Sequence, residues 1–187
     1  MVEVRWATVE DVADIESVRI AAWRAAYQEI LPATVLAGLT TTPERVALLS
    51  ERITERKARF LVAILDGVNV GHLVSGVPQE FSDHQIGALY VSPFHQGRRI
   101  GPTLVGQDIA LAIQEGASSA SIWSLEKNDR AARLYGETFG ADEVLSGTYD
   151  IEGTTYPTLG FIYRDLPGLL QRLETLTQRT YSPHLEP

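Results

Sequence analysis

The stretch with the clearest chemical potential is a short loop that combines two glycines with two arginines. It spans residues 96–101, with the sequence QGRRIG, and a stretch of helical periodicity follows it. The N–H groups of a helix's first turn lack backbone partners, and the helix dipole adds partial positive charge there. Glycines let the backbone approach a phosphate, and the guanidinium groups of Arg98 and Arg99 add charge. The loop therefore predicts a site for an anionic group.

Two common phosphate-binding motifs do not match this loop. No Gly-Lys-Ser or Gly-Lys-Thr follows it, as a P-loop requires, and its glycines lack the Gly-x-Gly-x-x-Gly spacing of dinucleotide sites. Taken alone, the pattern also fits an ordinary strand-to-helix turn whose Gly and Arg residues serve solubility. The elements around the loop therefore matter for its interpretation.

Apolar periodicity predicts a strand before the loop, and a helix, a strand and a second helix after it. These four elements are expected at residues 85–91, 100–114, 120–125 and 128–139. Pro93 ends the first strand, and Asn128 or Asp129 can cap the second helix. Gly116 and Gly140 are suitable residues to close the two helices.

The rest of the chain alternates between the two periodicities. Strands are expected at residues 2–6, 60–65, 68–77, 144–151 and 155–163, and helices at about 9–29, 33–39 and 43–57. Asp66-Gly67 and Glu152-Gly153 predict hairpin turns, and residues 78–83 a loop. This order predicts a mixed α/β layer with hairpin and crossover connections. The last twenty residues are polar, with a weak helical pattern over 166–176, and predict a surface helix and a frayed tail.

Length and composition limit the class of protein. The 187 residues predict one domain of ordinary size, and the absence of cysteine excludes disulfides, thiolate metal sites and a cysteine nucleophile. The formal net charge of −8 disfavours nucleic acid and anionic membranes and mildly favours cationic partners such as amines. Without a secretory signal or a run of roughly 18 apolar residues, we expect a cytoplasmic protein without membrane association. Four scattered histidines predict no metal site.

The loop and the strand end before it resemble the cofactor-binding motif of the GNAT superfamily of N-acetyltransferases, Gln/Arg-x-x-Gly-x-Gly/Ala. Gln96 occupies the first position and Gly101 the last, and the hydrophobic-Tyr-Val-x-Pro strand end of many members precedes them. Arg99 stands in place of the middle glycine. A side chain therefore projects from a turn that approaches the pyrophosphate in this family.

A second stretch, residues 128–141, is similar to the family signature Asn-x-x-Ala-x-x-x-Tyr-x-x-x-Gly-Phe, with Ala141 where Phe is common. Taken alone, the helical spacing of Leu134, Tyr135 and Phe139 favours core packing. The order and separation of the two motifs, each after a strand, extend the resemblance over about residues 2–164.

A third and weaker likeness lies in the first helix. Trp23 and Tyr27, followed by Leu31-Pro32, are similar to a pattern in members whose first helix lines the acceptor groove. The resemblance implies that Trp23 and Tyr27 bind the acceptor, with the hairpin 144–163 shaping the same pocket.

The resemblance implies a mixed, mainly antiparallel sheet of about seven strands flanked by helices over residues 1–165, followed by a C-terminal helix and tail over 166–187. It implies acetyl-coenzyme A as co-substrate, a primary amine of a small molecule or peptide as acceptor, and the homodimer common in the family. The residues implied in cofactor binding are Leu89, Tyr90, Val91, Gln96, Gly97, Arg98, Arg99, Ile100, Gly101, Pro102, Thr103, Asn128 and Tyr135.

The family's mechanism assigns Tyr135 as the acid that protonates the leaving thiolate. Gln85 stands near the position of the usual basic carboxylate and cannot accept the proton. The base is therefore left open among His84, Asp83, His72 and bulk water. Histidine as a residue type suits this work, and His84 is the favoured side chain.

Two other readings remain open on the sequence. The Gln85 and Arg99 departures are compatible with a catalytically silent module that binds acyl-coenzyme A and regulates. An unrelated α/β domain with a phosphate-binding turn would bind nucleotides as readily as coenzyme A.

Overall fold

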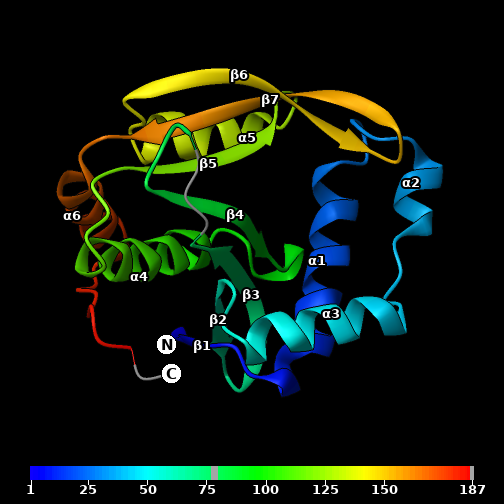
Figure 1. The fold of residues 1–187 in the computed structure, drawn as a ribbon, viewed down its shortest axis with the longest axis horizontal. Helices are drawn as coiled ribbons and strands as arrows, with labels where there is room; N and C mark the ends of the chain where they lie inside the picture. The colour runs from blue at the N-terminus through cyan, green and yellow to red at the C-terminus, as the bar shows by residue number, and fades with distance from the viewer. Residues whose placement is uncertain (77–79, 186–187) are drawn as a thin grey trace.

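The computed structural model describes residues 1–76 and 80–185 (Figure 1). Seven strands form one sheet in the order β1-β2-β3-β4-β5-β7-β6. All neighbours are antiparallel except β4 and β5, which run parallel. The predicted fold class, a mixed and mainly antiparallel sheet of about seven strands flanked by helices, is confirmed.

The strands and helices alternate along the chain largely as the periodicity indicates. The strands are β1 (Glu3–Trp6), β2 (Arg59–Leu65), β3 (Val68–Ser75), β4 (His84–Val91), β5 (Ala120–Leu125), β6 (Glu143–Ile151) and β7 (Thr154–Tyr163). The α-helices are α1 (Val12–Ala26), α2 (Ala33–Gly38), α3 (Pro43–Thr54), α4 (Ile100–Gln114), α5 (Asp129–Ala132) and α6 (Leu166–Thr177). Short 3₁₀ turns lie at η1 (Val9–Asp11) and η2 (Pro93–His95), and a π-helical turn, η3 (Arg133–Thr138), continues α5.

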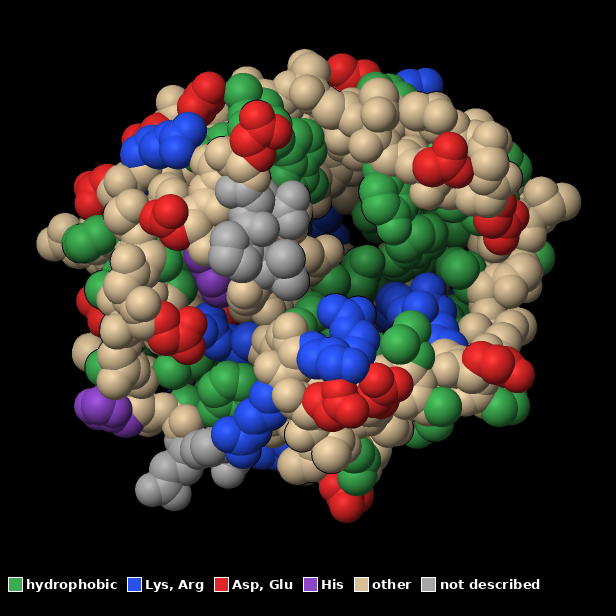
Figure 2. Space-filling model, in the orientation of Figure 1, with side chains coloured by type: hydrophobic (Ala, Val, Ile, Leu, Met, Phe, Trp, Pro, Cys, Tyr) green, Lys and Arg blue, Asp and Glu red, His purple; other side chains and the backbone are tan. Residues whose placement is uncertain are grey.

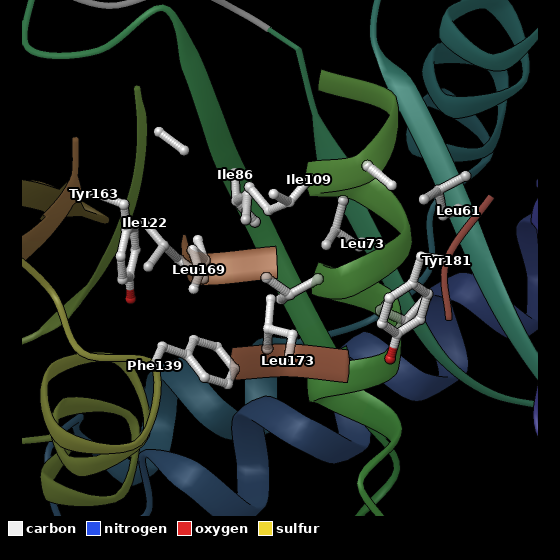
Figure 3. Close-up of a cluster of buried hydrophobic side chains, with 14 of the residues drawn as sticks. Leu61, Leu73, Ile86, Ile109, Ile122, Phe139, Tyr163, Leu169, Leu173 and Tyr181 are labelled. Carbon is white, nitrogen blue, oxygen red and sulfur yellow. The ribbon is translucent and has the colours of Figure 1, made fainter. Parts of the chain in front are cut away.

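Helices cover both faces of the sheet. Figure 1 shows α4 and α6 on one side of the strands and α1, α2 and α3 on the other. Side chains from Leu61, Leu73 and Ile109 pack with α6 in the larger core (Figure 3). A smaller core, with Val62 and Ile15, joins the opposite face of the sheet to α1 and α3.

The predicted C-terminal helix is present as α6, close to its expected bounds of 166–176, but it packs into the core instead of lying on the surface, and the described residues after it contact the rest of the fold. Leu166, Leu169 and Leu173 of α6 are fully buried, because their spacing of three and four residues turns one face of the helix toward α4 and the sheet. Beyond the helix, the ring of Tyr181 lies against Gly106 of α4, where an added Cβ would approach it to 2.2 Å. The Trp6 indole donates a hydrogen bond of 2.9 Å to the carbonyl of Leu185.

The predicted boundaries hold best around the loop of interest. The helix predicted at 100–114 agrees with α4 at both ends, and the strand predicted at 120–125 agrees with β5 at both ends. The first helix is shorter than expected, since it begins with a 3₁₀ turn and ends at Ala26. The strand expected at 68–77 ends at Ser75, and its residue 77, with residues 78–79 of the expected loop, lies outside the described residues.

A buried ionic cluster fixes α4 on the sheet. Asp108 of α4 is fully buried and accepts hydrogen bonds from Arg59 at 2.6 Å, Ser75 at 2.5 Å and His84 Nε2 at 2.7 Å. Burial opposes the charge, but His84, Arg59 and Ser75 outweigh it, so the pKa of Asp108 is lowered. Three strands therefore hold one helix through a single carboxylate, which sets the position of the loop at its N-terminus.

Candidate active site

The site begins where two strands stop pairing. β4 and β5 are in register only from His84 with Ala120 to Ile86 with Ile122. At the next residue, Gly87, the pairing of β4 with β3 shifts, since Ile86 faces Ser75 and Ala88 faces Val74. Such an extra residue bends a strand. Beyond Ile86 and Ile122 the two strands therefore diverge and leave a gap in the sheet.

A cavity of about 530 Å³ occupies this gap. Figure 2 shows the molecule hollowed between the β6–β7 hairpin and α1. The walls come from the C-terminal end of α1, from β4 after the bulge, from the start of α4, from β5 and from the helix that follows it. Their residues include Ala22, Ala26, Tyr27, Gly87, Ala88, Leu89, Tyr90, Val91, Gln96, Gly97, Arg99, Ile100, Gly101, Pro102, Trp123, Ser124, Asn128, Arg130, Arg133 and Tyr135.

The loop 96–101 brings the start of α4 to the end of this cavity. No side chain caps the first turn of α4. A Cβ added at Gly101 would stand 3.9 Å from the side chains of both Leu89 and Val91, so the helix start already lies close against β4. The uncapped helix terminus therefore presents backbone N–H groups and positive potential at the mouth of the gap.

Arg99 adopts a conformation that glycine adopts more easily. Its φ is +61° and its ψ +19°, in the left-handed region, and Gly97 also has a positive φ of +79°. A left-handed residue with a side chain costs about 1–2 kcal/mol. This explains why a glycine is usual at the position of Arg99 in the resembling motif, and shows that the turn forms here without one.

Three guanidinium groups line the cavity, and the sequence reasoning identified only one of them. Arg130 and Arg133 join Arg99 in the wall, and Arg130 donates a hydrogen bond to the side-chain oxygen of Gln96. Arg130 and Arg133 are three residues apart, which places both on one face of the helix after β5; this spacing could have indicated them from the sequence. The cavity therefore carries local positive charge in a chain whose net charge is negative.

Two residues expected at the anion site are not part of the cavity wall. Thr103 is 4% exposed, and its hydroxyl donates a 2.8 Å hydrogen bond to the carbonyl of Arg99, so it stabilises the first turn of α4 instead of lining the cavity. Arg98 is exposed on the loop and is not among the residues of the cavity wall. Asn128 lines the cavity and also caps its helix, since its side-chain oxygen accepts from the N–H of Ala131 at 3.2 Å.

Three tyrosines from distant parts of the chain meet in the gap. Tyr27 comes from the end of α1, Tyr90 from β4 and Tyr135 from η3. Burial is the main cause that raises the pKa of Tyr135, and the proximity of Tyr27 and Tyr90 raises it further. Burial also raises the pKa of Tyr27 and of Tyr90. All three phenols are therefore held in the protonated form, in which each can donate a hydrogen bond.

The π-helical turn fixes the position of Tyr135. The N–H of Phe139 bonds the carbonyl of Leu134 instead of that of Tyr135, which widens the turn. The carbonyl of Tyr135 accepts a 2.8 Å hydrogen bond from the hydroxyl of Tyr163 on β7. A buried hydroxyl thus satisfies the carbonyl that the wide turn leaves free, and the ring of Tyr135 packs against Phe161 with centroids 5.7 Å apart.

The structure does not place the candidate bases at the cavity. His84 is 3% exposed, and its Nε2 faces Asp108 on the α4 side of the sheet, so the assignment of His84 as a catalytic residue is corrected to a structural role. Asp83 is exposed and accepts from the N–H groups of Ser118 and Ser119. His72 is buried beneath Tyr90, and burial lowers its pKa to about 3.

Trp23 also differs from its expected role. Its ring packs edge-on against Tyr27 at a centroid distance of 5.2 Å, and it is not among the residues of the cavity wall. Of the two residues expected to bind the acceptor, the structure brings only Tyr27 into the cavity. Trp23 contacts the ring of Tyr27 from outside the cavity wall. Trp123 of β5 lines the cavity instead, although no sequence motif pointed to it.

The structure combines a mixed sheet, a gap between its two parallel strands, and an uncapped helix start at the end of that gap. The chain belongs to the acetyltransferase (GNAT) family, whose family model matches residues 20–141. It is an enzyme of the N-acetyltransferase class. Among the described helices, none has both the length and the apolar character that a bilayer-crossing segment needs.

Relatives extend the likeness over almost the whole chain. The uncharacterized N-acetyltransferase YuaI of Bacillus subtilis (strain 168) is 27% identical over 172 residues, which cover 90% of this chain and 96% of that protein. The solved PaiA N-acetyltransferase from Thermoplasma acidophilum, in complex with coenzyme A, matches with a TM-score of 0.69 at 17% identity, covering 87% of this chain and 99% of that one. YncA from Salmonella typhimurium, solved with its cofactor acetyl-CoA, matches with a TM-score of 0.63 at 20% identity, over 88% and 94% of the two chains.

The left-handed conformation of Arg99 gives a testable difference between the two neighbouring arginines. We expect Arg99→Gly to leave the free energy of unfolding unchanged or to raise it by up to about 1 kcal/mol, because it removes a strained residue. Arg98, whose φ is not positive, is the matched control, and Arg98→Gly should lower that free energy by about 0.5–1 kcal/mol. Urea unfolding of both variants measures the difference, and equal effects would contradict the assigned strain.

Proposed function

We propose that this enzyme transfers an acetyl group from acetyl-coenzyme A to a primary amine, which attacks the thioester directly. The observation that carries the proposal is the gap between β4 and β5, which opens beyond Ile86 and Ile122 and ends at the uncapped start of α4. A narrow passage with a cationic end fits a long, thin co-substrate whose charge lies on phosphates.

The start of α4 is the proposed pyrophosphate site. The N–H groups of its first turn and the guanidinium of Arg99 supply positive charge, and Gly97 and Gly101 keep side chains out of the way. We extend the site to Arg130 and Arg133, which lie in the same wall. A guanidinium group can donate two parallel hydrogen bonds to the oxygens of one phosphate, so these arginines suit the phosphates of coenzyme A.

The edge of β4 after the bulge is the proposed site for the pantetheine arm. Leu89, Tyr90 and Val91 pair with β3 on one side and line the cavity on the side from which β5 has diverged. Backbone groups in such a position need polar partners. An N–H group there can also polarise a thioester carbonyl. Ser124, buried in the opposite wall with its hydroxyl unpartnered, offers a further hydrogen bond.

Acetyl-coenzyme A supplies an activated carbonyl: the acceptor nitrogen bonds to it, the C–S bond breaks, and a proton passes from the amine to the sulfur. Tyr135 is the proposed donor of the proton that the sulfur receives. Tyr135 lines the gap, its backbone carbonyl is held by Tyr163, and its raised pKa keeps the phenol protonated over the working range.

The structure offers the amine no carboxylate base. Among the described residues of the cavity wall there is no Asp or Glu. His72 and His84 are buried and are not among the wall residues. His95 does line the cavity, but it lies in η2, directly before the phosphate loop, with its Nδ1 3.3 Å from the Ser92 hydroxyl. We therefore propose that the acceptor enters as the neutral amine, having lost its proton to solvent, and that the enzyme contributes mainly by holding the two reactants together.

A calorimetric titration with acetyl-coenzyme A tests the cofactor assignment. We expect selective micromolar binding, since the cavity combines phosphate-binding and thioester-binding walls. NAD and ATP serve as controls, because they carry phosphates without the pantetheine arm. Binding of all three with similar affinity, or of none by the folded protein, would contradict the proposal.

Tyr135→Phe tests the acid. We expect turnover to fall by about 100-fold or more, the usual contribution of a positioned acid, with little change in affinity for acetyl-coenzyme A. Tyr181→Phe is the matched control, since it removes a buried hydroxyl from the far side of α4. Steady-state kinetics and calorimetry on both proteins give the comparison, and unchanged turnover of Tyr135→Phe would remove Tyr135 from this role.

The described cavity wall carries no carboxylate, and its histidine, His95, directly precedes the phosphate loop, so we expect a simple pH profile. Below the pKa of the acceptor amine, kcat/KM should rise about tenfold per pH unit, because only the neutral amine reacts. The raised pKa of Tyr135 means that the acid stays protonated as the pH rises, so no fall should follow within the stable range. Profiles recorded for two amines of different pKa should be displaced by that difference. A common inflection for both amines would indicate an enzyme base and overturn this account.

A further inference from the structure

The acceptor end of the cavity lies on the face of the sheet that α1 and α2 cover. Ala88 and Tyr90 of β4 and Trp123 of β5 line it, together with Tyr27 at the end of α1. Figure 2 shows hydrophobic side chains gathered along the wall of the hollow beside α1 and α2. This end lies across the sheet from α4, and the inference below rests on the proposed function, in which the cofactor enters from the α4 side.

Among the residues that the structure describes, none in the cavity wall offers a negative charge to a cationic acceptor. The described wall contains no carboxylate, and the three tyrosines are neutral phenols. Its charged side chains are Arg99, Arg130 and Arg133. A polyamine or a lysine-rich peptide would therefore find no carboxylate in this wall to pair with its additional ammonium groups.

Trp123 forms a fixed aromatic wall at this end. A Cβ added at Gly160 would stand 2.5 Å from the indole, and one added at Gly147 would stand 2.7 Å from it. The ring therefore lies directly on the backbones of β7 and β6, in space that only glycine leaves free. Phe81 packs on it with ring centroids 6.3 Å apart. A ring held in this way offers a rigid apolar surface that loses little entropy when a ligand binds.

Small residues leave room opposite this surface. Ala22 and Ala26 lie one helical turn apart on α1, and Gly87 and Ala88 follow the bulge of β4. Together they leave space between α1 and Trp123, within a cavity whose volume of about 530 Å³ suits a small molecule.

We propose that the acceptor is a small primary amine that carries a flat aromatic group, held by stacking against Trp123 and Tyr27 and not by an ion pair. The apolar wall, the space left by alanine and glycine, and the lack of carboxylate in the described wall all favour this class. The negative net charge of the whole chain suggested a cationic acceptor, but the described wall of the cavity carries no negatively charged side chain.

A panel of amines tests this class. The probes are 2-phenylethylamine and tryptamine against putrescine and lysine, each compared at equal concentration of the neutral amine. We expect kcat/KM for the aromatic amines to exceed that for the other two by about tenfold or more, as a filled apolar pocket discriminates. Equal or better use of putrescine or lysine would overturn the inference while leaving acetyl transfer intact.

A matched pair of variants on α1 tests the location. Ala26→Leu adds bulk to the α1 wall of the cavity, whereas Ala25→Leu adds the same side chain at the neighbouring position outside that wall. We expect Ala26→Leu to lower kcat/KM for 2-phenylethylamine by about tenfold or more and to affect methylamine much less. Ala25→Leu should leave both unchanged. An equal effect of Ala26→Leu on both amines would contradict the assigned pocket.

The same probes separate this inference from the proposed function. If no amine is acetylated although acetyl-coenzyme A binds, the proposed function fails. Calorimetric titration of the protein with 2-phenylethylamine and putrescine, in the presence of coenzyme A, then decides the inference by itself. Binding of the aromatic amine alone supports it, and binding of neither amine, or of putrescine alone, overturns it.

Discussion

The parallel pairing of β4 with β5 extends over only three residue pairs, and the rest of the site depends on where it stops. A parallel pair that continued would satisfy the backbone of Leu89 to Val91 and close the sheet. The extra residue at Gly87 bends β4 away instead. The backbone groups exposed by this divergence require polar partners, which an elongated ligand with amide groups can supply. The cavity therefore arises from interrupted hydrogen bonding, and side chains then give it chemistry.

The divergence would be of little use if the helix at its end were free to move. Asp108 prevents this, because one buried carboxylate binds side chains from β2, β3 and β4 at once. The leucines of α6 and the ring of Tyr181 cover the outer side of α4. Burying an isolated carboxylate would be costly, but three donors compensate for the lost water. The result is a rigid helix whose uncapped N-terminus is held against the end of β4.

The distribution of charge within the cavity differs from that of the whole chain. A net charge of −8 repels anions at long range, yet Arg99, Arg130 and Arg133 surround the passage next to α4. At the other end of the passage the described wall carries tyrosines, a tryptophan and small residues. The two ends therefore favour different partners, one anionic and one apolar. Tyr135 lines the same cavity, and the hydroxyl of Tyr163 holds its backbone by donating to its carbonyl.

The sequence by itself determined the elements and the loop: the periods of α4 and β5, the glycines and arginines of residues 96–101, and the family motifs that identified Tyr135. These depend on local spacing, which a sequence shows directly. The tertiary structure alone decided that His84 faces Asp108, that Trp23 lies behind Tyr27, that α6 is buried, and that Trp123 lies on two glycines. Each of these contacts joins residues distant in the chain or depends on which face of a strand a side chain occupies. Residue type and spacing do not specify them, because the partner across the sheet is set by the packing of the whole fold.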